Sequence, residues 1–66
     1  MIGVITYDKR SFERFIMEIS SEDRMMYFHL TDDTLRGRYI SGIVRLNDWE
    51  RVRNADGLYY EAKSRI

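Results

Sequence analysis

The feature that most constrains the fold is an amphipathic segment between two short apolar runs. Apolar side chains recur through this segment at helical spacing, and the positions between them are mostly charged. The apolar positions are Phe12, Phe15, Ile16 and Ile19. Asp8 comes just before the segment as an N-cap, because a carboxylate there accepts hydrogen bonds from the free amides of a first helical turn. The segment therefore predicts a helix that connects two strands and buries one face.

The two flanking runs have the length and composition of strands. Ile2–Tyr7 is short, apolar and β-branched, and Met25–Leu30 is almost continuously apolar, which is typical of a strand covered on both faces. A third strand is predicted at Ile43–Leu46, entered through Gly42. Arg45 interrupts this strand, so one face is accessible at that point or the arginine meets an acid.

A second amphipathic helix is predicted at the end of the chain. Its apolar stripe consists of Ala55, Leu58, Tyr59, Ala62 and Ile66. Asn54 is the natural N-cap of this helix. Glu61 and Arg65 lie one turn apart in the orientation that favours an ion pair.

The order of these elements is strand, helix, strand, turn, strand, helix. The turn is Thr31–Gly37, with Thr31 or Asp32 as its cap and Gly37 in the left-handed conformation that ends it. This order predicts one α/β domain over residues 1–66, with a small three-stranded, mainly parallel sheet and two helices. The connection Thr31–Ser41 is close to the minimum of about 10 to 12 residues for a parallel crossover, so the third strand can be parallel. An antiparallel third strand is the alternative.

The length of 66 residues is close to the limit at which a single core is stable, and the chain has no cysteine to add a disulfide or a zinc–thiolate site. The hydrophobic content of 44% is sufficient for a small packed core. A three-stranded sheet leaves two open edges, and a homodimer is one way to cover them. No apolar run approaches the roughly 18 residues needed to span a membrane, so we expect a cytoplasmic protein without a membrane partner.

Histidine, methionine and acidic residues are the side chains of this chain that could form a metal, cofactor or catalytic site. His29 is the only histidine, and we interpret it as a hydrogen-bonded strand residue. The three residues Met17, Met25 and Met26 are interpreted as adaptable core or dimer packing. Four carboxylates follow the second and third strands, where ligand sites of α/β proteins usually lie, and are either a magnesium or acid–base site or helix caps paired with Arg36 or Arg38. They are Asp32, Asp33, Asp48 and Glu50. We expect no catalytic, cofactor-binding or metal-binding residue.

The basic residues are concentrated in the middle of the chain. The net charge is zero, which argues against the broad positive field of a nonspecific nucleic-acid binder, but residues 36–53 hold five arginines against two carboxylates, a net charge of +3. Nine arginines and only two lysines occur in the chain, and guanidinium groups bind carboxylate or phosphate in a planar, bidentate way. The predicted partner-binding residues are Arg36, Arg38, Tyr39, Trp49, Arg51 and Arg53. Alternatively, these arginines neutralise nearby carboxylates on a solvated surface, and Trp49 closes the core.

Two family resemblances involve the same segment. Leu35–Arg38, followed by an apolar strand and by Asn47–Glu50, resembles the stretch leading into the acidic strand of RecA-like ATPases, including phage terminases and helicases. Those enzymes require a glycine-rich phosphate loop with a lysine and a hydroxyl after the first strand, whereas Thr6–Ser11 of this chain contains no glycine. The resemblance therefore does not imply nucleotide hydrolysis.

The second resemblance covers most of the chain. Tyr7–Asp8, Phe12 and Phe15, together with Leu35–Trp49, resemble a type of very small phage-encoded protein of unknown function. This resemblance implies phage origin and a location in the cytoplasm of the host cell. We expect a non-enzymatic interaction module that binds and modulates a host or viral protein, since a chain of this size has little room to enclose a substrate pocket. The alternative is a nucleic-acid-binding protein that uses the arginine-rich segment 36–53.

Overall fold

The three strands form one wholly parallel sheet in the computed structural model, which describes all 66 residues. The strand order is β2-β1-β3, so β1 is central and the other two strands are edges. The elements are β1 (Ile2–Ile5), α1 (Lys9–Met17), η1 (Arg24–Met26), β2 (Tyr27–His29), α2 (Asp32–Leu35), β3 (Gly42–Arg45), η2 (Trp49–Arg51) and α3 (Ala55–Lys63), where η denotes a short 3₁₀ helix. The predicted α/β architecture is confirmed, and the antiparallel alternative for the third strand does not occur. None of the helices is long and apolar enough to cross a membrane.

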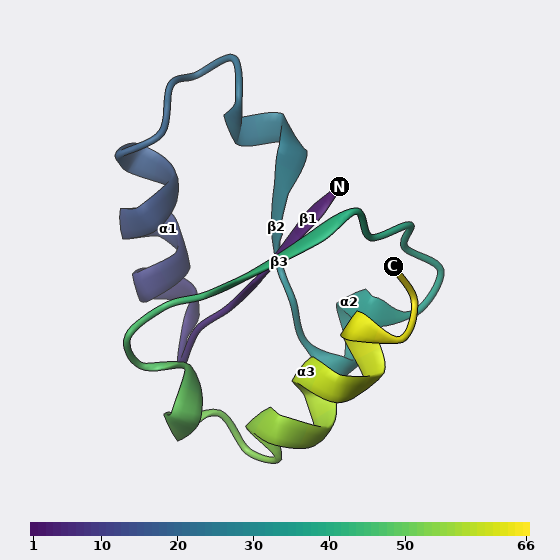
Figure 1. Cartoon of the computed structure of the whole chain (residues 1–66). Coiled ribbons are helices and arrows are strands. Elements are labelled where there is room, and N and C mark those ends of the chain that lie inside the picture. The colour runs from purple at the N-terminus through teal and green to yellow at the C-terminus, as the bar shows by residue number, and fades with distance from the viewer.

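Helices cover the two faces of the sheet unequally. Figure 1 shows α1 on one side of the strands and α2 with α3 on the other. Because side chains alternate along a strand, the paired residues Val4, His29 and Val44 share the face toward α1. On that face the Phe12 ring stacks on His29 with a centroid distance of 5.5 Å. The α1 side therefore packs mainly over the β2 half of the sheet.

The main core lies on the opposite face, beneath α2 and α3. Its buried residues are Ile5, Phe28, Leu30, Leu35, Ile40, Leu58 and Ala62. Gly3 of β1 faces this core, and a β-carbon there would lie 3.1 Å from Leu30 Cδ2. A side chain at this position would therefore force Leu30 to shift, because Leu30 occupies the space above the central strand.

Most of the predicted helix boundaries are confirmed by their capping interactions. Asp8 Oδ1 accepts a hydrogen bond of 2.8 Å from the amide of Ser11 and begins α1. Thr31 caps α2 through a reciprocal pair of hydrogen bonds with Thr34, and Gly37 follows with a φ of 73°, in the left-handed region that favours glycine. These contacts are local, which is why residue order alone predicted them.

The predicted side-chain cap by Asn54 is wrong. Asn54 does precede α3, but it has a φ of 56° and its side chain makes no capping hydrogen bond. The side chain instead lies against Gly57, where an added β-carbon would come within 2.6 Å of it. Ile66 also departs from the prediction, because α3 ends at Lys63 and leaves this side chain 62% exposed.

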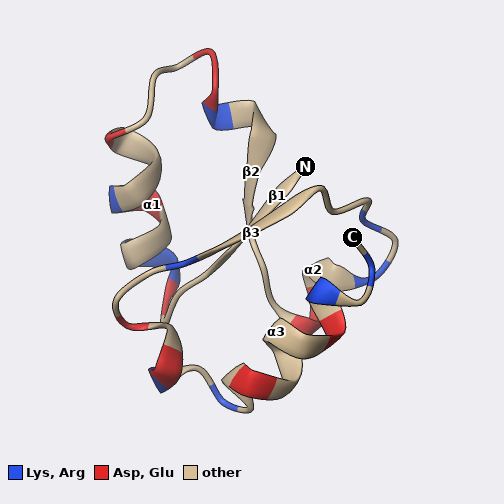
Figure 2. Ribbon diagram, viewed as in Figure 1, with Lys and Arg blue, Asp and Glu red and all other residues tan.

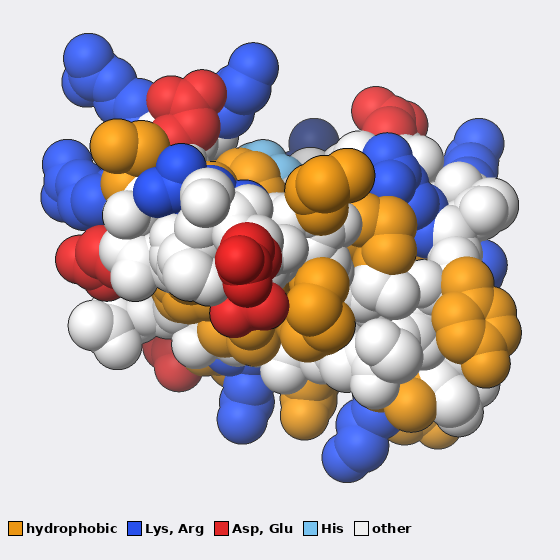
Figure 3. Space-filling model, turned by 90° about the horizontal axis from the view of Figure 1, so that it is seen from above, with side chains coloured by type: hydrophobic (Ala, Val, Ile, Leu, Met, Phe, Trp, Pro, Cys, Tyr) orange, Lys and Arg blue, Asp and Glu red, His pale blue; other side chains and the backbone are white.

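The second strand begins later than predicted, at Tyr27. Met25 and Met26 lie in η1, where they are 84% and 50% exposed, and Met17 is 70% exposed. The cause is Arg24, whose Nε donates to the carbonyl oxygens of Ile16 at 2.9 Å and Ile19 at 3.0 Å and so holds η1 against the end of α1. The core interpretation of the three methionines is therefore wrong. Figure 3, which views the molecule from above, shows hydrophobic side chains exposed among charged ones.

Candidate functional site

The six predicted partner-binding residues do not form one surface. Strand β3 divides them, since three precede it and three follow it. Gly42, at the start of β3, pairs with Ile2, whereas Arg45, at its end, pairs with Ile5, so the two groups lie beyond opposite ends of the sheet. Figure 2 shows the corresponding basic positions in the loop between α2 and β3 and in the segment that follows β3. The arginine-rich segment is thus two separate clusters.

The first cluster, residues 36–39, is called the arginine loop below. Its Tyr39 side chain is 83% exposed, while the next residue, Ile40, is 2% exposed and anchors the loop in the core. The Arg38 guanidinium lies over the Phe28 ring, 5.0 Å from its centroid, and Nη1 is 3.4 Å from the sulfur of Met1. The amino-terminal ammonium of Met1 donates to the Tyr39 carbonyl at 3.2 Å. Contacts with Phe28 and Met1 therefore fix the arginine loop, while an arginine and a tyrosine side chain of the loop are exposed to solvent.

The arginines of both clusters lack acidic partners within the chain. The ion pair of the molecule is the predicted one between Arg65 and Glu61, at 3.5 Å. Neither the arginine loop nor the segment after β3 forms an ion pair with Asp32, Asp33, Asp48 or Glu50. The alternative interpretation, in which the arginines pair with those carboxylates, does not describe this structure.

The second cluster is used mainly for contacts inside the molecule. Trp49 is half-buried, packs on the core and meets the Tyr59 ring edge-on at 5.8 Å. Arg45 stacks on both rings, with its guanidinium carbon 5.0 Å from the Trp49 centroid and 4.6 Å from that of Tyr59. Arg51 lies over the Tyr7 ring at 4.1 Å. Trp49 therefore closes the core, as the alternative interpretation expected, and Arg53 is the member of this cluster that is exposed with no such contact.

The four carboxylates considered as a possible site are not brought together. Asp32 and Asp33 lie in α2, which follows β2, whereas Asp48 and Glu50 follow β3, and β1 lies between those two strands. No three His, Cys, Asp or Glu side chains converge anywhere in the chain. His29 Nε2 donates to the Thr6 carbonyl at 3.3 Å, which confirms its interpretation as a hydrogen-bonded strand residue.

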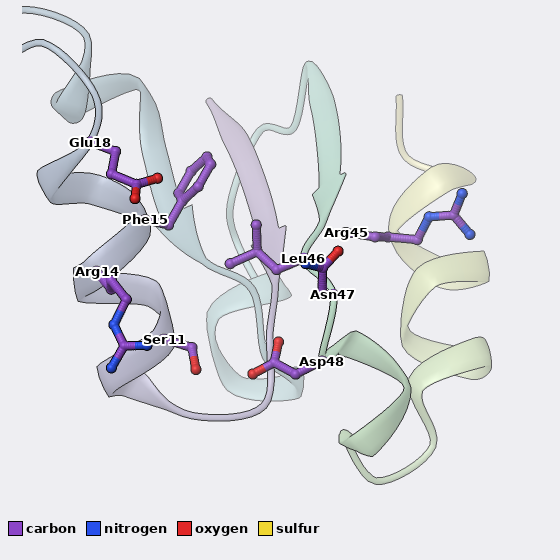
Figure 4. Close-up of a pocket in the computed structure, with 8 residues that line it drawn as sticks. All are labelled: Ser11, Arg14, Phe15, Glu18, Arg45, Leu46, Asn47 and Asp48. Atoms are coloured by element: carbon purple, nitrogen blue, oxygen red, sulfur yellow. The ribbon is translucent and has the colours of Figure 1, made fainter.

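A pocket that the sequence reasoning missed lies between α1 and the loop after β3. It has a volume of about 420 Å³ and is called the switch pocket below. Its lining residues are Ser11, Arg14, Phe15, Glu18, Arg45, Leu46, Asn47 and Asp48 (Figure 4). The chain leaves β1 toward one face of the sheet through α1 and reaches β3 from the other face through α2, so the connections diverge at this end. Such a divergence is where open α/β sheets bind ligands. Asp48 is the sequence signal for this pocket because it follows the third strand, but residue order does not show that β1 separates Asp48 from Asp32 and Asp33.

Asp48 is fixed at the inner end of this pocket. Its Oδ1 accepts a 2.6 Å hydrogen bond from the hydroxyl of Thr6, a residue that is 1% exposed. Burial is the largest influence on the pKa of Asp48 and acts to raise it. Hydrogen bonds from Thr6, from the Ser11 side chain and from the amides of Tyr7 and Asp48 together outweigh burial and hold the pKa below its ordinary value of 3.8. Asp48 is therefore a carboxylate that stays ionised at neutral pH.

By its fold and its surface, the protein is a small α/β domain with a wholly parallel sheet and an exposed arginine loop. No family model matches the chain, and no curated protein or solved structure matches it either. The function proposed below is accordingly inferred from the arginine loop.

Proposed function

We propose that the chain is a small, non-enzymatic protein-interaction module, phage-encoded and located in the host cytoplasm, that binds and modulates a host or viral protein. The contact surface of this proposal is the arginine loop. One observation carries it: Arg36 and Arg38 are exposed without any acidic partner, beside a tyrosine ring that is 83% exposed. The partner surface that fits this arrangement is acidic.

The residue types of the arginine loop and the contacts that fix Arg38 both favour binding of a partner protein. Arginine and tyrosine are enriched among the interface residues that contribute most of the binding energy. An unpaired guanidinium offers planar, bidentate hydrogen bonds to a carboxylate. Arg38 is held over Phe28 and beside Met1, so less of its conformational freedom is lost when a partner binds.

The segment after β3 has a smaller part in this proposal. Trp49 and Arg51 already contact rings within the chain, so a partner would have to displace those contacts. Arg53 is free but lies beyond the opposite end of β3 from the arginine loop. Both clusters contact the same partner only if that partner spans the length of the sheet.

The test compares two charge-matched double variants, Arg36→Ala with Arg38→Ala, and Arg51→Ala with Arg53→Ala. Each bait is used for affinity capture from host and phage-infected lysates, and the captured protein is purified and titrated against all forms. Truncating a hot-spot residue costs roughly 2 kcal/mol, so the loop variant should bind at least about 30-fold more weakly. The control variant should bind within about threefold of wild type, and unchanged circular dichroism shows that both remain folded. Equal losses in the two variants would contradict the assignment to the loop.

The second candidate function is binding of single-stranded nucleic acid, and the exposed Tyr39 ring in the same loop as two arginines without acidic partners is the observation that favours it. A base would stack on the ring while the arginines contact phosphates. This function predicts affinity for a labelled oligonucleotide that falls steeply between about 50 and 200 mM salt and is lost in the loop variant. The zero net charge of the chain counts against it.

Homodimer formation through the open edges of β2 and β3 or through the exposed methionines stays a prediction. Measurement of molecular mass by light scattering across a dilution series checks it. A mass that stays at one chain at every concentration would contradict it.

A further inference from the structure

We propose that the outer edge of β3 is a docking site for an extended acidic peptide segment, which adds to the sheet as a fourth strand. This inference rests on the proposed function and specifies the partner: main-chain hydrogen bonds hold an acidic segment of a protein along β3, and arginines bind it beyond the ends of the strand. Three observations carry it, namely the unpaired backbone groups of β3, the engaged backbone groups of β2 and the positive charge around β3.

The backbone of β3 has unpaired groups along its outer edge. The Leu46 amide donates to the Ile5 carbonyl of the central strand at 3.1 Å. Because backbone groups alternate in direction along a strand, Ile43 and Arg45 direct their N–H and C=O groups away from β1. No backbone or side-chain group elsewhere in the chain hydrogen-bonds them. Two donors and two acceptors are therefore available to a fourth strand.

The helices leave this edge uncovered. In Figure 1 the three strands overlap at the centre of the view, and the helices lie to either side of that point. The strand order is β2-β1-β3, so this line of sight passes along the sheet from one edge to the other, and no helix crosses it. An added strand can approach β3 in the plane of the sheet.

The opposite edge of the sheet is partly closed by the chain itself. By the same alternation, Tyr27 and His29 direct their backbone groups outward on β2. The Tyr27 amide donates to the Arg24 carbonyl, and the His29 carbonyl accepts a hydrogen bond of 2.7 Å from the Thr34 hydroxyl. Half of the outer groups of β2 are thus already paired, and β3 is the edge that can accept a complete strand.

The charges around β3 select an acidic occupant. The arginine loop precedes the strand, Arg45 ends it, and Arg51 and Arg53 follow, so that residues 36–53 carry a net charge of +3. A second copy paired edge to edge would bring two such segments together, and like charges on neighbouring strands are destabilising. An acidic segment instead places carboxylates beside guanidinium groups that have no ion-pair partner.

The side chains of β3 predict the pattern of the added strand. Val44 points to the α1 face of the sheet, where α1 lies mainly over β2, and Arg45 points to the opposite face. Neighbouring side chains on one face of a sheet contact each other across the strands. An occupant with an apolar residue beside Val44 and a carboxylate beside Arg45 therefore has apolar and acidic residues in alternation.

The probe for the test is a capped, symmetric peptide with the sequence Glu-Glu-Thr-Glu-Val-Glu-Thr-Glu-Glu, titrated at low salt into isotopically labelled protein. Its extended length of roughly 30 Å reaches beyond both ends of β3. We expect a Kd of about 0.1 mM, with slower hydrogen exchange of the Ile43 and Arg45 amides and no change at the His29 amide on the other edge. The same peptide with glutamine in place of every glutamate should bind at least about tenfold more weakly.

Two N-methylated forms of the peptide test the main-chain hydrogen bonds. Amides of an added strand face β3 at every second residue, so methyl groups block these bonds either at the central residue or at its two neighbours, according to strand direction. One form should therefore bind at least about fivefold more weakly than the parent peptide, and the other within about twofold of it. Equal binding by the two forms would overturn the proposal, because charge attraction alone has no such alternation.

The variant with Arg36→Ala and Arg38→Ala separates this inference from the proposed function. An unchanged peptide affinity together with a persisting difference between the N-methylated forms would support strand addition and contradict the assignment to the arginine loop. Weaker binding without that difference would support the loop and overturn strand addition.

Two further outcomes would also overturn the proposal. One is the absence of any peptide-induced change at the Ile43 and Arg45 amides at millimolar peptide concentration. The other is a molecular mass of two chains by light scattering, with these amides protected before peptide is added, which would place a second copy on this edge.

Discussion

Replacing Thr6 by valine tests the most buried polar contact in the molecule. Thr6 follows β1, is 1% exposed, and donates a 2.6 Å hydrogen bond to Asp48, a residue 42 positions away that follows β3. This bond joins the carboxyl ends of two neighbouring strands. Valine keeps the branched shape of threonine and replaces the hydroxyl by a methyl group, so the change removes the donor with little change in volume.

The expected loss of stability follows from the charge and burial of the bond. A hydrogen bond to a charged group contributes about 1.5 to 3 kcal/mol, and burial of the new methyl group regains roughly 0.8 kcal/mol. We therefore expect the free energy of unfolding to fall by about 1 to 2 kcal/mol. For a chain of 66 residues this lowers Tm by roughly 5 to 15 °C.

The loss should depend on pH, with a sign set by the lowered pKa of Asp48. A carboxyl group with a lower pKa in the folded state than in the unfolded state stabilises the fold above its ordinary pKa of 3.8. This contribution disappears as the pH falls below that value through the folded-state pKa. The difference between wild type and Thr6→Val should accordingly be complete at about pH 7 and shrink below about pH 4. The pKa of Asp8 is also lowered, chiefly by the Ser11 amide, but its effect is common to both proteins and cancels in the difference.

Urea denaturation followed by circular dichroism between about pH 2 and pH 7 measures this difference. Thr6→Ser is the matched control, since it keeps the hydroxyl and should keep the pH-dependent part of the stability while losing a methyl contact. A double-mutant cycle with Asp48→Asn isolates the coupling between the two side chains. A valine variant as stable as wild type at neutral pH, or a deficit that is the same at every pH, would refute the reasoning.

Three further changes test the packing and the helix end. Gly3→Ala should lower the free energy of unfolding by about 1 to 3 kcal/mol, because its β-carbon would lie 3.1 Å from Leu30. Gly42→Ala is its control in the neighbouring strand, where the nearest atom would be 3.7 Å away, and an equal loss in both would contradict the packing argument. Arg24→Ala should cost about 1 to 2 kcal/mol and speed amide exchange in the last turn of α1, because Arg24 holds the carbonyl groups there, and unchanged exchange would show that the helix end needs no such cap.

Local pattern was sufficient for most of the secondary structure of this chain. The helical spacing from Phe12 to Ile19, the cap at Asp8 and the left-handed Gly37 depend on residues three or four positions apart, so residue order is enough to predict them. The late start of the second strand is not predicted, because local pattern does not show contacts with other segments of the chain. Apolar Met25 and Met26 fit a strand pattern, but Arg24 reaches back to α1 and holds them outside the sheet.

The surfaces depend on contacts between distant residues. Periodicity shows which side chains share a face, but it does not show which strand lies beside which, and the order β2-β1-β3 is what separates Asp32 from Asp48 and brings Asp48 to Thr6. The arginine-rich segment is continuous in sequence, yet an extended strand within it carries its two halves to opposite ends of the sheet. Residue order therefore specified the order of the elements and the caps at Asp8 and Thr31. Strand order and packing created the free arginine loop and the switch pocket, because both depend on which distant segments become neighbours.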